Sequence, residues 1–402
     1  MRRNAVLFVA ISLLSGFGGG AMALVASVWI LDLTGSAGIA ALAGLCVYAP
    51  QLAGPWLGDL VDRVPRRALV VTVNLILAAV LLSLLAVRTA AQAWLIFAVS
   101  LAYGVGYVLL DAGETALLPA ALPVAKLGDV NGWRSSAQEG MKLVAPLAGA
   151  GLYAWYGGRA VAVLSAAMPA LSAVLYGALR LTRPTPDPAP VRNRRISTGL
   201  AVIRGRRVLR VTVSLAAVSI AMSGFQTAPT YSLVTTDLGL PATFLGVLTS
   251  AQGAGSIVGG LVVGRLLAWR DPIAVGVAGT VLFGTACLVR CLPWWPATVA
   301  AGVIAGVGLP WTLVAAVTAV QTHTPAALLG RVAAMANTAM FAPIALAIPL
   351  GSAAVHAGSR PPLVAAAAVC LTAAAVMPSR RTVGRDAGRP GAEGLTGAAR
   401  SG

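Results

Sequence analysis

Apolar stretches of about 20 residues recur along the whole chain and limit its fold more than any other feature. Clusters of charged residues, proline and glycine separate twelve of them, at residues 5–31, 37–57, 68–88, 93–113, 138–157, 160–180, 210–233, 243–267, 272–291, 296–318, 330–354 and 361–378. An apolar helix of about 20 residues crosses the hydrocarbon core of a bilayer. The chain is 58% hydrophobic and 10% charged, whereas a soluble domain is about 25% charged. The sequence therefore predicts an all-α, multi-pass membrane protein with twelve transmembrane helices.

The basic residues are distributed unevenly between the predicted loops. If the N-terminus is cytoplasmic, 24 of the 29 arginines and lysines fall in cytoplasmic segments, and four fall outside: Arg88, Arg159, Arg290 and Arg360. Loops that remain in the cytoplasm carry the excess of Lys and Arg. We therefore expect a protein of the cytoplasmic membrane with both termini in the cytoplasm.

The longest break between apolar stretches covers residues 181–209. Proline occupies every second position from 184 to 190, and such a run cannot form a helix. We expect a basic cytoplasmic linker here, in which residues 196–208 form an amphipathic helix at the inner leaflet. The linker divides the chain into an N-terminal half (1–180) and a C-terminal half (210–378) with six helices each. The polar, basic tail, 379–402, is expected to be disordered.

Composition and motifs exclude several other classes of protein. The net charge of +17 comes from arginines in alternate loops without interleaved aromatic residues, so no nucleic-acid partner is expected. Both lysines, Lys126 and Lys142, are followed by Leu, so the chain lacks the Gly-Lys-Ser/Thr of an ATP-binding loop. The two histidines, His323 and His356, are too far apart for a helical zinc pair. We expect no enzyme activity, no metal and no cofactor.

A charged loop separates the second and third apolar stretches. Its residues, Gly58-Asp59-Leu60-Val61-Asp62-Arg63-Val64-Pro65-Arg66-Arg67, cannot lie in hydrocarbon, because lipid does not solvate their charges. The loop resembles the cytoplasmic loop of the major facilitator superfamily, which runs Gly-x-x-x-Asp-Arg-x-Gly-Arg-Arg. The matching residues are Gly58, Asp62, Arg63, Arg66 and Arg67, and Pro65 replaces the usual Gly. The alternative is an ordinary positively charged hairpin loop.

The resemblance implies a role for this loop and a fold for the chain. Members of the family have two parallel six-helix halves. At the inner end of the eighth stretch, Gly260-Leu261-Val262-Val263-Gly264-Arg265 resembles the loop that follows the second stretch, about 200 residues earlier. In the family the loop Asp, here Asp62, faces the amino end of the eleventh helix when the cytoplasmic side is shut. The loop is therefore expected to act as a gate.

Further stretches resemble the macrolide-efflux branch of bacterial drug exporters. They are Leu31-Asp32-Leu33-Thr34-Gly35-Ser36, Tyr48-Ala49-Pro50-Gln51-Leu52-Ala53-Gly54-Pro55 and Ala251-Gln252-Gly253-Ala254-Gly255-Ser256. Ala145-Pro146-Leu147-Ala148-Gly149 is a degraded form of the Gly-Pro-x-x-Gly element of antiporters, because Ala145 replaces its first Gly. This resemblance implies export of drugs in exchange for protons.

Three acidic residues are placed to carry protons. Asp111 and Glu114 lie three apart at the predicted inner end of the fourth helix, and Glu139 lies at the predicted start of the fifth, three residues before Lys142. Burial of a carboxylate favours its protonated form, which proton coupling requires. The resemblance implies that Asp111 and Glu114 pair with Arg63, so Glu139 is the favoured proton carrier. A structural pair, in which Lys142 extends toward the membrane surface, is the alternative.

The remaining polar and aromatic residues of the apolar stretches are candidates for a substrate cavity: Trp29, Tyr48, Gln51, Asn74, Tyr103, Gln226, Gln252, Trp311, Thr312 and Asn337. Each could equally form a hydrogen bond within the helix packing. Many apolar groups and few charges suit a large hydrophobic solute.

These features predict a secondary transporter that exports a hydrophobic antibiotic or secondary metabolite in exchange for protons by alternating access. Its expected partners are this small molecule, protons and the lipid bilayer, and we expect a monomer. Two alternatives remain open. One is an importer or a siderophore or metabolite exporter of the same fold. The other is a membrane scaffold that does not transport.

Overall fold

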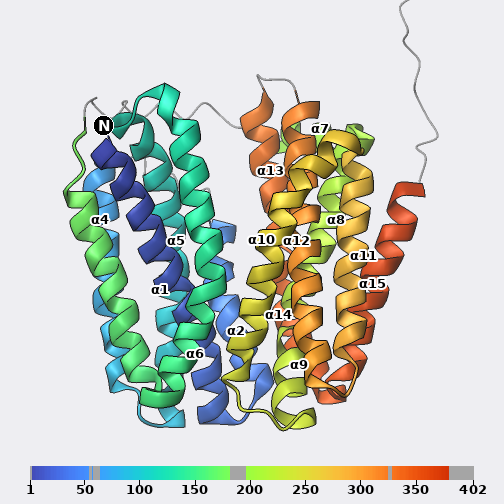
Figure 1. The fold of residues 1–402 in the computed structure, drawn as a ribbon, viewed down its shortest axis with the longest axis horizontal. Helices are drawn as coiled ribbons and strands as arrows, with labels where there is room; N and C mark the ends of the chain where they lie inside the picture. Colours follow the sequence, from blue (N-terminus) through green and yellow to red (C-terminus); the bar gives the residue numbers. More distant parts are fainter. Residues whose placement is uncertain (1, 54–56, 58–63, 182–195, 325–327, 380–402) are drawn as a thin grey trace, which may run out of the picture.

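The computed structural model describes residues 2–53, 57, 64–181, 196–324 and 328–379. Within these ranges every regular element is a helix, and the helices form two bundles that lie side by side (Figure 1). Ten of the described helices are long and apolar enough to cross a membrane, and a shorter apolar helix covers Ala37–Ala53. The all-α membrane fold predicted from the sequence is confirmed.

The first bundle begins with α1 (Arg2–Thr34) and α2 (Ala37–Tyr48), which a 3-10 turn, η1 (Ala49–Ala53), continues. The bundle continues with α4 (Arg66–Leu82) and the 3-10 turns η2 (Ser83–Ala86) and η3 (Ala90–Gln92). It ends with the two long helices α5 (Ala93–Ala121) and α6 (Val124–Gly177).

The second bundle follows a short helix, α7 (Ile196–Gly205). Its helices are α8 (Arg207–Phe225), α9 (Thr227–Ser232) with the π-helix η4 (Leu233–Asp237), α10 (Phe244–Trp269), α11 (Pro272–Arg290), α12 (Trp295–His323), α13 (Leu329–Phe341), α14 (Ile344–Ala354) with the 3-10 turn η6 (Val355–Ala357), and α15 (Arg360–Ser379).

α6 contains two membrane passes. Gly157 has φ 74° and ψ 178° and interrupts the helix, a conformation that glycine adopts readily because it has no Cβ. The chain reverses there: Tyr153 bonds to Asp32 near the last turn of α1, whereas the carbonyl of Gly177 accepts a bond from Arg67 at the start of α4. The structure therefore confirms the predicted break between the fifth and sixth apolar stretches.

Several predicted helix bounds were wrong. α6 begins at Val124, whereas the fifth helix was expected to begin at 138, and α5 continues to Ala121. Both segments are more polar than the spans they extend, so a hydropathy pattern does not detect them. The seventh stretch is not one helix: α8 ends at Phe225 and η4 widens into π-helical geometry. The eleventh stretch is divided by Pro343, which caps the start of α14.

The two ends of the molecule differ in how the bundles meet. We name the end at which α1 begins and α7 lies the linker end, and the opposite end the far end (Figure 1). Near the far end one hydrophobic core includes both bundles, since Trp29 and Leu31 belong to the same cluster as Val234 and Leu245. Toward the linker end, the buried residues of each cluster belong to one bundle. Phe8 and Leu117 belong to a cluster in the first bundle, and Leu209 and Val332 to a cluster in the second, against which the partly buried Leu42 and Leu45 of α2 also pack. The described structure is therefore closed at the far end.

Small residues allow the bundles to approach closely. A Cβ added to Gly246 of α10 would lie 2.5 Å from the Cβ of Ala150 on α6, and one added to Gly253 would lie 2.6 Å from the carbonyl oxygen of Lys142. On the other side, a Cβ added to Gly38 of α2 would lie 2.8 Å from Oγ of Ser352 on α14. Close packing of glycines is the usual way in which membrane helices gain contact area.

The ends of α1 in the first bundle and of η4 in the second bundle are built in a similar way. Asp32 accepts a hydrogen bond of 2.8 Å from the Tyr153 hydroxyl, and Asp237 accepts one of 2.5 Å from Ser359. Each aspartate is followed within three residues by a glycine with positive φ, Gly35 at 67° and Gly239 at 61°. The two bundles thus repeat a local design at corresponding places, as expected for parallel structural repeats.

Candidate functional site

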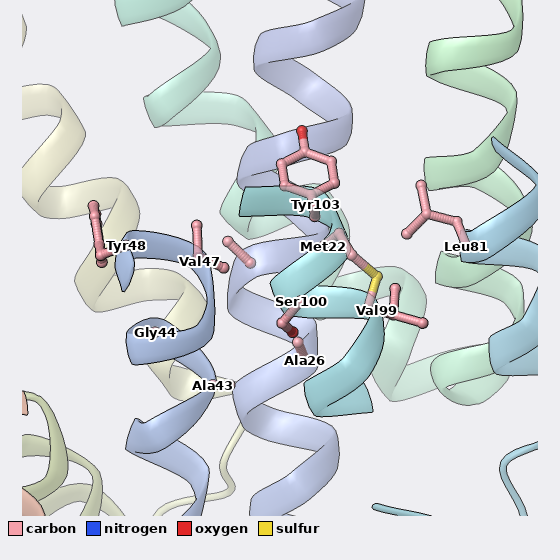
Figure 2. Close-up of a pocket in the computed structure, with 11 residues that line it drawn as sticks. Met22, Ala26, Ala43, Gly44, Val47, Tyr48, Leu81, Val99, Ser100 and Tyr103 are labelled. Atoms are coloured by element: carbon pink, nitrogen blue, oxygen red, sulfur yellow. The ribbon is translucent and has the colours of Figure 1, made fainter. Parts of the chain in front are cut away.

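A small cavity opens in the first bundle where α1, α2, α4 and α5 meet. Its volume is ≈ 90 Å³, and its walls include Met22, Leu81, Ser100 and two of the predicted cavity residues, Tyr48 and Tyr103. Figure 2 shows Tyr48 on α2 and Tyr103 on α5 with their rings extending toward the same end of the cavity. Sites that enclose a drug-sized molecule measure about 300–1,000 Å³, so this cavity holds one apolar group rather than a whole ligand.

The polar face of α5 continues from this cavity toward the linker end. Tyr103, Tyr107 and Asp111 follow each other at intervals of four residues, which places them on one face of the helix. Tyr107 is 54% exposed and Asp111 is exposed too. The direction of α5 follows from its last residue, Ala121, whose carbonyl accepts a bond from Asn4 at the start of α1. Two phenols and a carboxylate therefore form a stripe that runs away from the cavity.

A buried ion pair lies beside this stripe. The guanidinium of Arg134 on α6 contacts Oε2 of Glu114 on α5 at 2.6 Å, and both side chains are almost covered. Arg134 also donates to Oγ of Ser12 on α1 at 3.2 Å, and the buried Tyr176 lies next to Glu114. The pair therefore joins α1, α5 and both arms of α6.

The sequence analysis predicted that Glu114 pairs with the loop residue Arg63. Arg63 lies outside the described residues, as do Gly58 and Asp62, so this pairing stays a prediction. Among the described residues Glu114 forms an ion pair with Arg134. Arg66 and Arg67 begin α4, and Arg67 donates to the carbonyl of Gly177. The expected position of Glu139 at the start of the fifth helix was wrong, since fifteen residues of α6 precede it. The side chain of Glu139 is not among those that the structure describes. Lys142 is exposed on α6.

The other predicted cavity residues are scattered. Asn74 is buried and donates to Val70 of its own helix at 2.7 Å, and Thr312 bonds to Leu309 of its own helix. Trp311 donates to the carbonyl of Gly259 at 3.1 Å and joins α12 to α10. The rest lie in the far-end core (Trp29), in η1 (Gln51), on α10 (Gln252) and exposed on α13 (Asn337). Only Tyr48 and Tyr103 of the ten are brought together at the described cavity.

A second buried guanidinium lies in the other bundle. Arg290, at the end of α11, is 4% exposed and donates to Oε1 of Gln226 at 2.5 Å. Gln226 is the residue at which α8 gives way to α9. Nε of Arg290 has no hydrogen-bond partner among the described residues. Sequence reasoning placed this arginine in an outside loop, and no local pattern could have shown that it turns inward.

Three residues of these sites were missed as candidates: Tyr107, Arg134 and Arg290. The spacing of Tyr103, Tyr107 and Asp111 was present in the sequence and could have identified Tyr107. Arg134 was counted only as a cytoplasmic loop charge, because the start of α6 was placed after it. In the described ranges no group of three or more His, Cys, Asp and Glu side chains could hold a metal ion.

Comparison with known proteins gives one family. The sequence profile described as Major Facilitator Superfamily matches residues 7–267 and 212–399. Macrolide efflux protein A of Streptococcus pyogenes is 24% identical over 189 residues, which are 45% of this chain and 46% of that protein. The match therefore spans about half the length of this curated relative.

Solved structures with the same fold cover nearly the whole chain. A POT family transporter in complex with a thioalcohol conjugated peptide has a TM-score of 0.73 at 12% identity, over 94% of this chain and 95% of that one. The nucleoside transporter NupG has a TM-score of 0.71 at 14% identity, over 93% and 99%. A bacterial homologue of the iron transporter ferroportin, in an inward-facing state, has a TM-score of 0.68 at 17% identity, over 94% and 100%. At such identities these structures are evidence for the fold alone.

Proposed function

This chain belongs to the Major Facilitator Superfamily, and on that premise we propose that it exports a hydrophobic small molecule across the cytoplasmic membrane in exchange for protons. Family membership makes the chain a secondary transporter and not an enzyme. The substrate, the direction of transport and the coupling to protons are the proposed part.

The apolar wall of the described cavity is the observation that carries the proposed substrate class. Met22, Leu81 and Val99 line it together with the two tyrosines, and none of its described lining residues is charged. Such a surface favours a solute that gains by leaving water. The partial similarity to a macrolide efflux protein supports export of a compound of this kind rather than import of a polar nutrient.

The arrangement of the bundles supports an alternating-access cycle. We propose that the linker end faces the cytoplasm, because the basic residues concentrate there. The shared core at the far end then closes the outer side, and the described state is the one that takes up substrate from the cytoplasm. The two bundles act as the two six-helix domains, 1–180 and 210–378, and rock against each other.

We also propose the loop of Gly58, Asp62, Arg63, Arg66 and Arg67 as the gate on the cytoplasmic side. Its Asp62 would approach the positive end of the helix dipole of α13 when that side closes. Asp62→Asn should lower the transport rate while the amount of protein in the membrane stays the same. Unchanged transport by this variant would reduce the loop to a signal for membrane orientation.

The proposed function is tested by a drug-susceptibility panel. An efflux-deficient host is grown with the intact chain, with the Asp62→Asn variant or with an empty vector, over a set of hydrophobic antibiotics. Protection by the intact chain, with lower accumulation of the compound inside the cells, is the expected result. An importer would instead raise accumulation and sensitivity, and a scaffold would change neither.

A further inference from the structure

We propose that a groove between α6 and α10, near the far end, binds one acyl chain of a phospholipid from the leaflet at that end. In the proposed orientation this is the outer leaflet of the cytoplasmic membrane. The groove is separate from the cavity in the first bundle and lies where the two bundles meet. Because its ligand is a component of the membrane, the site does not depend on which solute the protein transports.

The groove is formed by small residues on one face of α6. It has a volume of ≈ 280 Å³, and its wall consists of Leu147, Ala150, Gly151 and Ala154 of α6 and of Pro241, Thr243, Phe244 and Val247 at and just before the start of α10. The four residues of α6 follow each other at intervals of three, one and three, which places them on one face of the helix. Three of the four are glycine or alanine, so their side chains leave the space between the two helices open.

The glycines on the two helices confirm where the helices touch and where they separate. A Cβ added to Gly246 would lie 2.5 Å from the Cβ of Ala150, whereas one added to Gly151 would have nothing within 4 Å. On the other wall, the ring of Phe244 packs edge-on against Trp295 of α12, with ring centroids 6.0 Å apart. The helices are therefore in contact at Ala150 and leave a space beside Gly151.

The groove opens on the lateral surface of the protein. α6 and α10 lie side by side along the boundary between the bundles (Figure 1). The core that both bundles share lies behind the groove, because Ala150 and Leu245 belong to it. Leu147, Ala154 and Pro241 are nevertheless exposed. Since the shared core separates them from the space between the bundles, their exposed side is in contact with lipid.

Aromatic residues place the groove just inside the membrane surface. Trp155 and Tyr156 directly follow Ala154 and are strongly exposed, and Trp295, beside Phe244, is exposed as well. Exposed tryptophan and tyrosine gather at the level of the lipid headgroups. The α6 wall continues from there for seven residues, which correspond to about 10 Å along a helix. The groove therefore runs from the headgroups into the hydrocarbon, as an acyl chain does.

The chemistry of the wall suits a hydrocarbon chain. None of the described lining residues is charged, and Thr243 is the only one with a polar side chain. An empty groove would lose the dispersion contacts of its walls, and a chain that fills it restores them. Lipid tails are as apolar as the groove, so the fit of the chain, and not its escape from water, is the source of affinity.

An arginine at the same end suits the phosphate of the lipid. Arg159 lies five residues after Ala154, beyond the break at Gly157, and is exposed. Five residues span at most about 18 Å even when fully extended, so a headgroup above the groove lies near this guanidinium. The planar guanidinium matches the oxygens of a phosphate. We therefore expect a phospholipid rather than a neutral lipid.

The groove exists only while the bundles meet at the far end. Each bundle supplies one wall, and the contact between Gly246 and Ala150 has to separate when that end opens. A ligand that binds one of two conformations more tightly shifts the equilibrium toward it. The bound chain therefore stabilises the state that is closed at the far end.

Retention of lipid by the purified protein tests this proposal. The protein is reconstituted with phosphatidylglycerol and transferred to detergent, and native mass spectrometry measures the lipid that stays bound. We expect one phosphatidylglycerol per protein. A diazirine on one of its acyl chains should label the peptides that contain Gly151 and Val247. Gly151→Leu places a side chain in the groove and should lower the affinity about tenfold, the scale of a change of about 1.4 kcal/mol in binding energy.

Gly260→Leu is the matched control. It makes the same substitution at an exposed position of α10 that is not part of the groove and has nothing within 4 Å of an added Cβ. This variant should retain lipid as the intact protein does. Gly246→Val, which pushes the two walls apart without entering the groove, should lower retention, because the closed arrangement is lost.

A second pair of probes tests the contact with the phosphate. Diacylglycerol with the same acyl chains lacks the phosphate and should be retained less than phosphatidylglycerol. Arg159→Gln should remove this difference, whereas Arg88→Gln, a change of another exposed arginine at the far end, should preserve it. Equal effects of the two arginine variants would exclude Arg159 from the site.

The lipid site is overturned if the intact protein retains no phospholipid, or if Gly151→Leu and Gly260→Leu retain equal amounts. It is also overturned if the retained molecule is a hydrophobic compound other than a lipid, since the groove would then belong to the path of a solute. None of these measurements involves transport. Failure of export in the susceptibility panel therefore leaves the lipid site standing, and loss of the lipid site leaves export untouched.

Discussion

Arg134 and Glu114 form an ion pair of 2.6 Å in which neither side chain has more than 14% of its surface exposed. The pair lies in the part of the first bundle where three chain segments meet, since Arg134 also bonds to Ser12 of α1. Burying two charges is costly, and the attraction between them roughly offsets that cost. Removal of one partner, however, leaves the other charge buried without compensation.

The first prediction follows from this asymmetry. Arg134→Gln should lower the free energy of unfolding by about 3–5 kcal/mol, because Glu114 would remain buried without its cation. The measurement is the midpoint temperature at which the purified protein loses its monodisperse elution peak. Arg360→Gln is the matched control: its contact with Asp237 is 3.8 Å long and half exposed, so about 0–1 kcal/mol is expected. Equal midpoints for the two variants would contradict the prediction.

A second prediction concerns Arg290 and Gln226. Gln226→Leu removes the acceptor of the 2.5 Å bond and should cost about 1.5–3 kcal/mol, the range for a hydrogen bond to a charged group. The double variant Gln226→Leu with Arg290→Met replaces both partners by apolar groups and should recover most of this loss. The same melting measurement checks both variants. A double variant less stable than the single one would show that the guanidinium has another role.

The general architecture could be predicted from the sequence, because hydropathy and the charge of the loops are properties of local stretches. The twelve apolar stretches correspond to the ten long helices, one of which, α6, is divided in two at Gly157, together with the shorter helix of Ala37–Ala53. The breaks inside passes could not be predicted. At the change from α8 to α9, Gln226 accepts a hydrogen bond from Arg290, which lies 64 residues further along the chain. Arg134, near the polar start of α6, contacts Ser12 of α1 and Glu114 of α5.

The candidate site was predictable only where spacing along one helix defines it. Asp111 and Tyr103 were identified as separate candidates, and their common face with Tyr107 required only the helical period. The partnership of Glu114 with Arg134 required tertiary structure, since 20 residues and a turn between two helices separate them. A sequence pattern does not specify which of several cytoplasmic arginines turns inward.

The third prediction concerns the contact between bundles. Gly246→Val introduces a side chain where even a Cβ would lie 2.5 Å from Ala150, so it should force the far end open. A cysteine at Ser100, which lines the cavity, should then react several-fold faster with an impermeant thiol reagent added outside cells, in a background without the native cysteines.

Gly260→Val is the control for this change. It lies on the same helix, and nothing lies within 4 Å of a Cβ added there, so it should leave the labelling rate as in the parent. Equal labelling of Gly246→Val and Gly260→Val would mean that this glycine contact does not hold the far end closed.

The fourth prediction concerns orientation. A cysteine introduced at Arg192, within the proposed cytoplasmic linker, should resist the impermeant reagent in intact cells and react after the cells are lysed. A cysteine at Arg88, which follows η2 at the far end, should react in intact cells. The reverse pattern would place the linker outside and would overturn the proposed direction of the cycle.

The last prediction concerns proton coupling. Asp111, Glu114 and Glu139 are the acids that the sequence predicts near the cytoplasmic half of the cavity, and Glu114 forms an ion pair with Arg134. Glu139 remains the proposed proton carrier. It must release its proton on one side of the membrane and take one up on the other, because lipid does not tolerate it charged throughout.

In proteoliposomes with an imposed pH gradient, Glu139→Gln should therefore abolish uphill accumulation of substrate while downhill exchange continues. Asp32→Asn, a carboxylate change at the far end, should accumulate substrate as the parent does. Uphill transport by Glu139→Gln at the parent's rate would exclude this residue as the carrier, and uphill transport by all three neutral variants would exclude coupling through this part of the bundle.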